Sequence, residues 1–190
     1  MTRLVAVVGS VTPPGRLRQA VEFALDQARQ SNPQLEAELV DLADYKVSFA
    51  DGRPLDAYTD DTAAVVARLE AADAILLATP VYRATFTGAL KNLLDLTPVE
   101  ALQAKPVGII AMGATLHHYL GADWQLRAVL SWFGALTLPT SCYLSSDHFS
   151  EGRLADVAAM AGLGQLSTAV VHALELPGDL GPPPLASRRS

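Results

Sequence analysis

Hydroxyl, arginine and aromatic side chains gather in two stretches of this chain, each directly after a run of apolar residues. Residues 9–16 read Gly-Ser-Val-Thr-Pro-Pro-Gly-Arg, and residues 78–95 read Ala-Thr-Pro-Val-Tyr-Arg-Ala-Thr-Phe-Thr-Gly-Ala-Leu-Lys-Asn-Leu-Leu-Asp. Hydroxyl and backbone N–H groups beside an arginine suit an anion, and a flat ring with polar edges could lie against Tyr82. These stretches therefore predict a site for a ligand that combines an anionic group with a planar ring.

The first stretch lies between a predicted strand and a predicted helix. Backbone N–H groups at a helix start are unpaired and lie at the positive end of the helix dipole, so they attract an anion. Ser10 and Thr12 can add hydroxyl groups, and Arg16 can add a charged donor. The stretch contains neither GxGxxG nor GxxxxGK[ST], which leaves a mononucleotide phosphate as the expected anion. An ordinary strand–helix turn with two prolines is the alternative.

The sequence offers no recognisable set of catalytic side chains. It contains no Ser-His-Asp or Cys-His arrangement and no GxSxG turn. His117 and His118 are adjacent, but neither a carboxylate nor a third ligand follows at metal-binding spacing. Cys142 is the single cysteine, so the chain has no internal disulfide and no CxxC pair. We therefore expect no metal site, and these residues point to no catalytic side chain.

Composition limits the class of protein. The chain has 190 residues, of which 50% are hydrophobic and 18% charged, as in a folded globular domain. Its net charge of −6 disfavours nucleic acid as a partner, because phosphate backbones require a basic face. No apolar run approaches the roughly 20 residues that span a bilayer, and the run 4–8 is too short for a signal peptide. We expect a cytoplasmic protein that contacts neither membrane nor nucleic acid.

Short apolar runs alternate with segments of helical periodicity. Parallel neighbouring strands need crossover connections, so this alternation predicts an α/β fold, with a doubly wound, five-stranded parallel sheet and helices on both faces. No repeat or linker divides the chain, and we expect one domain over 1–176 with a mobile tail over 177–190. The expected strands are Leu4–Val8, Leu35–Leu42, Ala74–Thr79, Pro106–Met112 and Leu136–Tyr143, and the expected helices are Arg16–Arg29, Asp60 or Asp61 to Ala71, Gly88–Leu96, Leu116–Phe133 and Gly152–Leu176.

Residues 80–95 closely resemble the flavin-ring loop of the NAD(P)H-dependent FMN reductases, a flavodoxin-like family. The resemblance covers most of residues 3–150 and is greatest to reductases that supply reduced flavin to sulfonate-cleaving monooxygenases. It implies the strand order 2-1-3-4-5. It also implies that backbone groups of this loop bind the flavin pyrimidine edge. Phe86 is expected to pack in the core or at an interface. The residues that inherit the ring-binding roles are Pro80, Val81, Tyr82, Arg83 and Thr85.

Two other loops match the family in part. In residues 9–17, Thr12 stands where the family has Arg, and Gly15 and Leu17 stand where it has Ser. These differences remove two hydroxyls and one charge, so weaker phosphate binding, or another flavin or ligand, is an alternative. In residues 112–118, Ala114 replaces a second glycine. The resemblance implies that Ser10, Thr12, Arg16, Gly113, Ala114 and Thr115 complete the cofactor site.

The resemblance implies reduction of FMN by NADPH or NADH, with reduced flavin passing to a partner monooxygenase. A quinone- or azo-type reductase that retains FMN is one alternative, and a non-catalytic binding protein with an altered phosphate loop is another. Trp124 stands where the sulfonate-linked reductases carry Tyr, in a helix widened by one residue at a tetramer interface. We therefore expect a homodimer or a dimer of dimers with the Trp124 helix at an interface.

Overall fold

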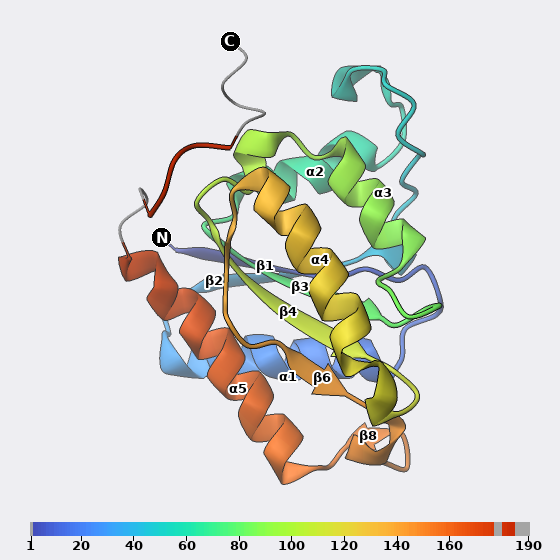
Figure 1. Ribbon diagram of the computed structural model, residues 1–190, viewed down its shortest axis with the longest axis vertical. Coiled ribbons are helices and arrows are strands. Elements are labelled where there is room, and N and C mark those ends of the chain that lie inside the picture. Colours follow the sequence, from blue (N-terminus) through green and yellow to red (C-terminus); the bar gives the residue numbers. More distant parts are fainter. Residues whose placement is uncertain (1, 177–179, 185–190) are drawn as a thin grey trace.

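A computed structural model of the chain describes residues 2–176 and 180–184, and parallel strands alternate with helices along it (Figure 1). The strands are β1 (Arg3–Val8), β2 (Glu36–Asp41), β3 (Ala74–Pro80), β4 (Pro106–Met112), β5 (Leu136–Thr137), β6 (Cys142–Leu144), β7 (Phe149–Ser150) and β8 (Arg153–Leu154). The α-helices are α1 (Arg16–Ser31), α2 (Thr62–Ala71), α3 (Gly88–Leu96), α4 (Tyr119–Phe133) and α5 (Val157–His172). Short 3₁₀ turns at Leu42–Asp44 and Leu55–Ala57 interrupt the segment between β2 and α2.

The main sheet has the order β2-β1-β3-β4-β5, and β6 also pairs with β4. Every pairing in this sheet is parallel. The doubly wound topology and the expected order 2-1-3-4-5 are therefore confirmed. The largely apolar strands β1, β3 and β4 lie at the centre of the sheet, covered on both faces, and the more polar β2 lies at its edge.

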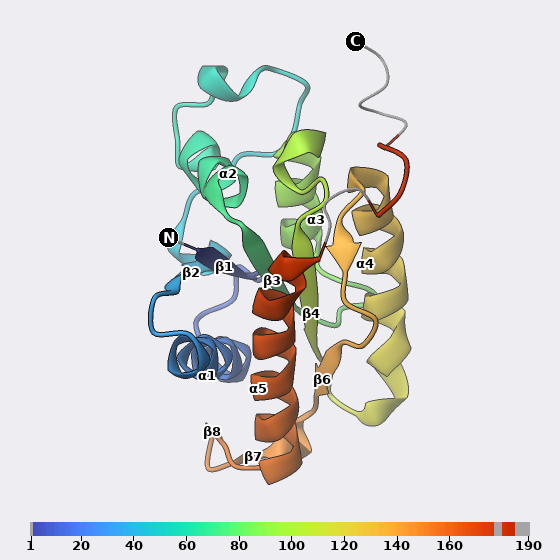
Figure 2. The ribbon, with the colours of Figure 1, turned by 90° about the vertical axis from the view of Figure 1, so that its left-hand side faces the viewer.

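The helices form a layer on each face of the sheet (Figure 2). Leu4, Ala6 and Val8 of β1 point to the layer formed by α1 and α5. Val5 and Val7 point to the other layer, formed by α2, α3 and α4. This alternation follows from the two-residue repeat of a strand, which sends successive side chains to opposite faces.

The expected last strand, 136–143, is wrong as a single element. It divides into β5 and β6, which pair with different parts of β4. Pro139 lies between them and has no N–H group to donate, so the chain leaves the sheet after Leu138 donates to the carbonyl of Val107. The intervening residues form a strap along the edge of the sheet.

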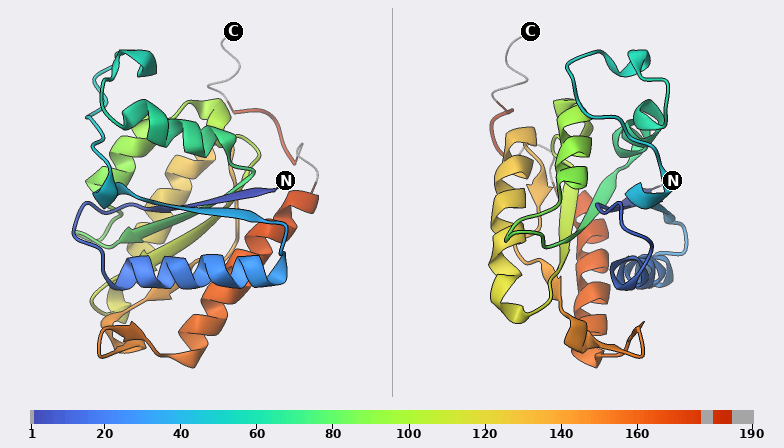
Figure 3. Two further views of the ribbon diagram at one scale, coloured as in Figure 1. Left: turned by 180° about the vertical axis from the view of Figure 1, so that it is seen from behind. Right: turned by 90° about the vertical axis from the view of Figure 1, so that its right-hand side faces the viewer.

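The last two helices begin later than expected. A 3₁₀ turn over Leu116–His118 precedes α4. The last helix was expected to begin at Gly152. Residues 149–154 instead form a hairpin of β7 and β8. Its turn residues Glu151 and Gly152 both have positive φ, which a tight two-residue hairpin requires. The hairpin lies beside the start of α1 (Figure 3), and α5 starts after it with Asp156 as the capping residue.

One described helical segment, Val157–Glu175, is long and apolar enough to cross a membrane. We expected no apolar stretch to approach the length of a membrane span, and by length and composition this expectation is wrong. The segment instead packs on α1 and the sheet, and Leu163, Leu166 and Val170 belong to the core. Of the expected mobile tail, residues 177–179 and 185–190 lie outside the described residues, and residues 180–184 border a cavity with Gly134 and Ala135.

Candidate functional site

Three loops meet where β1, β3 and β4 end, at the right-hand side of Figure 1. We call residues 9–15 the phosphate loop, residues 81–87 the ring loop and residues 113–118 the third loop. Backbone hydrogen bonds join each loop to the next strand: the Gly9 N–H donates to Ala78, the Val81 N–H to Met112 and the Gly113 N–H to Leu144, at 2.7, 2.8 and 3.0 Å. The carboxyl edge of a parallel sheet is the usual ligand site of this architecture.

The phosphate loop presents unpaired donors at the start of α1. Gly15 is the N-cap, and no side chain of the described residues caps this helix end. The hydroxyl of Ser10 lies 2.7 Å from that of Thr12 and also accepts from the Thr12 N–H at 3.2 Å. Both hydroxyls thus lie at the positive end of the helix dipole, where an anion is stabilised.

Arg16, the first residue of α1, is the cation available to a ligand beside this loop. It shares a cavity of about 220 Å³ with Ser10, Thr12 and Pro80. Within the described residues it has no carboxylate partner, and its guanidinium lies 5.7 Å from the ring centre of Phe149. The residues present therefore fit a phosphate monoester, with a free cation and an uncapped helix end.

Arg18 lines the same cavity but is already neutralised. Its guanidinium lies 3.3 Å from the carboxylate of Asp41, 2.9 Å from that of Asp44 and 3.0 Å from that of Glu22. Asp41 is 2% exposed and also accepts from the Ala43 N–H. Arg18 therefore balances a buried charge at the rim of the cavity, a role that the sequence did not indicate.

The family differences in the phosphate loop have different structural consequences. Leu17 is buried among the α1 and α5 residues of the core. Where the family has a serine hydroxyl, this chain therefore has an apolar side chain packed in the core. Gly15 is exposed, and a Cβ there would meet nothing closer than the Pro13 carbonyl at 3.9 Å. The ligand side of the loop therefore remains open.

The ring loop contains a two-residue hairpin turn. Tyr82 and Thr85 exchange two backbone hydrogen bonds, of 2.9 and 3.1 Å. Arg83 and Ala84 between them have φ of 52° and 63°. Gly121 of α4 supports this turn, since a Cβ there would lie 2.5 Å from the Ala84 carbonyl oxygen. Tyr82 is 48% exposed beside the turn, which leaves its ring free to contact a ligand.

We expect Ala84→Gly to stabilise the protein by about 0.5–1 kcal/mol. A left-handed conformation costs an L-residue roughly 1–2 kcal/mol, and the greater entropy of glycine in the unfolded chain offsets part of the gain. Ala128→Gly, on the exposed face of α4, is the matched control and should destabilise by about 1 kcal/mol. Urea unfolding of both variants measures the two values, and a loss of stability in Ala84→Gly contradicts the strain.

The base of the ring loop is buried and tied to the phosphate loop. The hydroxyl of Thr87 donates to the Gly9 carbonyl and accepts from the Leu90 N–H, so Thr87 also caps α3. Phe86 is 8% exposed and packs in the core, as expected. The side chain of Val81 packs against the same core. Its N–H is bound to Met112, so that group is not free for a ligand.

The third loop depends on Tyr143, a residue that sequence reasoning missed. Its hydroxyl donates to the Thr115 carbonyl at 2.6 Å, and its ring meets that of Tyr119 edge to face. A Cβ on Gly113 would lie 1.9 Å from the Tyr143 hydroxyl. Ala114 and Thr115 are exposed on the loop that Tyr143 holds in place. Tyr143 belongs to β6, which pairs with the end of β4 next to the third loop. The single strand predicted over 136–143 did not indicate this position.

Cys142 is unsuited to redox or nucleophilic chemistry, because burial raises the pKa of its thiol to about 11. At pH 8 this leaves about 0.1% thiolate, against roughly a quarter for an ordinary cysteine. We expect iodoacetamide to alkylate the folded chain about 100-fold more slowly than the urea-unfolded chain at pH 8. The rate should rise with pH towards 11. Mass spectrometry over time measures both rates, and similar rates contradict the burial.

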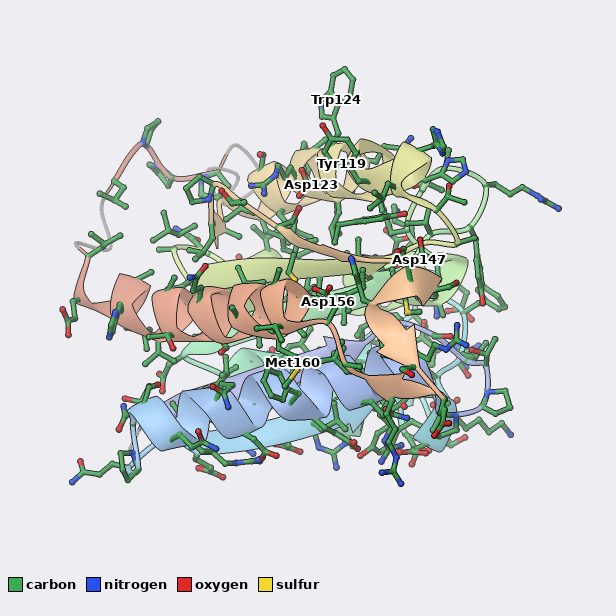
Figure 4. All side chains as sticks on the ribbon, turned by 90° about the horizontal axis from the view of Figure 1, so that it is seen from below. Tyr119, Asp123, Trp124, Asp147, Asp156 and Met160 are labelled. Atoms are coloured by element: carbon green, nitrogen blue, oxygen red, sulfur yellow. The ribbon has the colours of Figure 1, made fainter. Side chains whose placement is uncertain are left out.

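Trp124 projects from the outer face of α4, away from the body of the molecule (Figure 4). Its side chain is 77% exposed, and that of Trp132, two turns further along, is 60% exposed. The carboxylate of Asp123 holds the guanidinium of Arg127 through two hydrogen bonds. The helix is α-helical from Tyr119 to Phe133, so the widened turn implied by the resemblance is absent from this described segment.

Comparison with known proteins agrees with this geometry. A family model for NADPH-dependent FMN reductase matches residues 2–149. The NAD(P)H-dependent FAD/FMN reductase of Geobacillus thermodenitrificans is 40% identical over 153 residues, covering 80% of this chain and 83% of its own. The NADH-dependent FMN reductase SfnF of Pseudomonas putida is 31% identical over 177 residues, covering 92% and 94%.

Solved structures show the same architecture. The apo form of the NADH:FMN oxidoreductase EmoB superposes with a TM-score of 0.73 at 26% identity and full coverage of both chains. An archaeal flavodoxin superposes with a TM-score of 0.66 at 10% identity, which shows the flavodoxin-like fold alone. From its sequence, its sheet order and its three loops, the chain belongs to the NADPH-dependent FMN reductase family and is an oxidoreductase of that family.

Proposed function

We propose that this protein reduces FMN with NADH or NADPH and releases the reduced flavin, so that FMN is a substrate and not a permanently held group. The observation that carries the proposal is the uncapped start of α1, which shares one cavity with Ser10, Thr12 and Arg16 beside the ring loop. The rim of this site supports exchange, because Arg16, Tyr82 and Leu116 are all exposed.

Each loop has a positioning role in this proposal. Arg16 and the first-turn N–H groups of α1 hold the phosphate, and Ser10 and Thr12 turn their hydroxyls towards it. Tyr82 and the ring-loop backbone orient the flavin ring, with Arg83 and Thr85 at its edge. Bound FMN supplies the hydride-accepting chemistry, and the protein contributes orientation instead of an acid or base.

The reduced flavin is proposed to serve a partner monooxygenase, and a flavin that leaves through an open rim is suited to that use. A reductase that retains FMN is the second candidate. Azo reduction, one activity of this candidate, is supported by similarity to the NADPH azoreductase of a Bacillus strain, which is 28% identical over 156 residues and covers 82% of this chain and 84% of its own.

Self-association through α4 is also proposed. Trp124 and Trp132 expose large apolar rings on one helix, and Trp132 and Val129 border a cavity between α3 and α4. Apolar surface of this kind favours an interface over solvent. Trp124→Glu should lower the mass measured by light scattering, and Gln125→Glu, at an exposed neighbour, is the matched control. A monomeric wild-type chain contradicts the proposal.

Steady-state kinetics on the flavin-stripped protein test the proposed reaction. NADH or NADPH oxidation should depend on added FMN and saturate with it, and FMN should leave the protein on gel filtration. Retained FMN with ping-pong kinetics on an azo dye or quinone would establish the second candidate instead. A folded, FMN-binding protein that oxidises neither nucleotide would contradict both.

A further inference from the structure

A second cavity lies away from the phosphate and ring loops, between α5 and the strap that joins β5 to β6. Its volume is about 540 Å³, within the usual range for small-molecule sites. One wall is the small-residue side of α5, with Ala158, Ala159 and Gly162. The facing wall includes Leu138 and Cys142. From Asp156 to Ala169, α5 borders this cavity over about 20 Å.

One end of this cavity carries a fixed donor–acceptor pair, His148 and Asp156. The His148 carbonyl accepts from the N–H groups of Ala155 and Asp156 at 3.0 and 3.1 Å, so the two side chains come from adjoining backbone. Asp156 lies where α5 begins (Figure 4). Thr140, Ser141 and Gln165 add uncharged polar groups elsewhere on the lining, and the rest of it is largely apolar.

Hydrogen bonding determines what each of the pair can offer. Nδ1 of His148 accepts from the Ser145 N–H at 3.1 Å, so the proton of the neutral imidazole is on Nε2, which remains a donor. Oδ1 of Asp156 accepts from the Ala159 N–H at 2.7 Å. Oδ2 of Asp156 and Nε2 of His148 make no hydrogen bond within the described residues. Asp156 can therefore accept from a ligand, and His148 can donate to it.

We propose that this cavity is a second ligand site, for an uncharged small molecule with an aromatic body and a hydroxyl group, such as a phenol. Its hydroxyl would donate to Asp156 and accept from His148, while its ring would lie along Ala159 and Gly162. The Asp156 carboxylate disfavours an anion, and none of the described residues that line the cavity is a lysine or arginine. Tyr143 lines this cavity and also donates a hydrogen bond to the Thr115 carbonyl of the third loop.

Nuclear magnetic resonance titration with 4-methylphenol tests the site, with toluene as the probe that lacks the hydroxyl. Saturable amide shifts are expected at residues 142, 159 and 162. Binding of toluene should be at least about 10-fold weaker, because toluene can make neither the charge-assisted hydrogen bond to Asp156 nor the neutral one to His148. Repeating the titration with excess FMN keeps the phenol out of the flavin site. Shifts that FMN abolishes, or equal binding of the two probes, overturn the proposal.

Two variants separate the cavity from general surface binding. Gly162→Leu should fill the cavity and weaken 4-methylphenol binding at least 10-fold, since a Cβ there meets only the Cys142 sulfur, at 3.8 Å. Leucine favours a helix, so this variant should fold. Ala161→Leu, on an exposed position of the same helix, is the matched control.

Asp156→Asn retains an N-cap residue but replaces a carboxylate acceptor by an amide. It should weaken 4-methylphenol binding severalfold and leave toluene binding unchanged. Undiminished phenol binding in both Gly162→Leu and Asp156→Asn overturns the proposal. These readouts do not require FMN, so failure of the proposed flavin chemistry leaves them interpretable.

Discussion

Replacing Arg16 with alanine should weaken FMN binding by about 10- to 100-fold and leave riboflavin binding nearly unchanged, because a charge-assisted hydrogen bond contributes roughly 1.5–3 kcal/mol. Arg16 borders the phosphate-loop cavity and has no carboxylate partner within the described residues. Its charge is therefore available to the phosphate that FMN carries and riboflavin lacks. Flavin fluorescence titrations of both ligands measure the two affinities.

The matched control is Arg29→Ala, at the other end of α1. Arg29 is exposed and pairs with Asp26, so its removal changes the net charge equally but at a distance from the loop. FMN affinity should be almost unaffected in this variant. An equal loss of FMN and riboflavin affinity in Arg16→Ala would indicate a structural effect, and no loss at all would place the phosphate elsewhere.

Gly113→Ala should destabilise the protein by about 1–3 kcal/mol, the usual cost of forcing atoms into a packed site, and should lower FMN turnover. The added Cβ would lie 1.9 Å from the Tyr143 hydroxyl and 3.0 Å from the ring carbon that bears it. Either Tyr143 or the third loop must move, and the hydrogen bond to the Thr115 carbonyl is lost with it. Urea unfolding and steady-state kinetics measure the two effects.

A second substitution identifies the cause of that loss. Tyr143→Phe removes the oxygen at 1.9 Å and leaves only the ring contact, so Gly113→Ala should cost much less in the Tyr143→Phe background than in the wild type. Gly88→Ala is the control, because among the described residues no atom outside the neighbouring helix backbone lies within 4 Å of its Cβ position. Additive costs in the double variant would show that Tyr143 is not what excludes the methyl group.

Local patterns were sufficient to predict most of the fold. The helix Gly88–Leu96 and the strand Pro106–Met112 have the bounds that periodicity indicates, because the helix follows the capping residue Thr87 and the strand is apolar and begins at a proline. The predicted residues Ser10, Thr12 and Arg16 do line one cavity with Pro80. This grouping could be predicted because the residues follow the ends of strands, and the carboxyl ends of parallel strands meet at one edge of the sheet.

The features that were missed depend on contacts between distant segments. Tyr143 reaches Thr115 across 28 positions of sequence, and nothing local marks it as part of the site. The neutralisation of Arg18 requires Asp41 to end the neighbouring strand. The β7–β8 hairpin has a local signal, Glu151-Gly152, which the apolar run that follows it obscured.

Equilibrium titration of the flavin-stripped protein with FMN is the most direct test of the central claim, that the three loops at the carboxyl edge of the sheet form a flavin site. The account predicts saturable binding of one FMN per chain, with a dissociation constant in the micromolar range or below. Absence of binding by a protein that circular dichroism shows to be folded would contradict it.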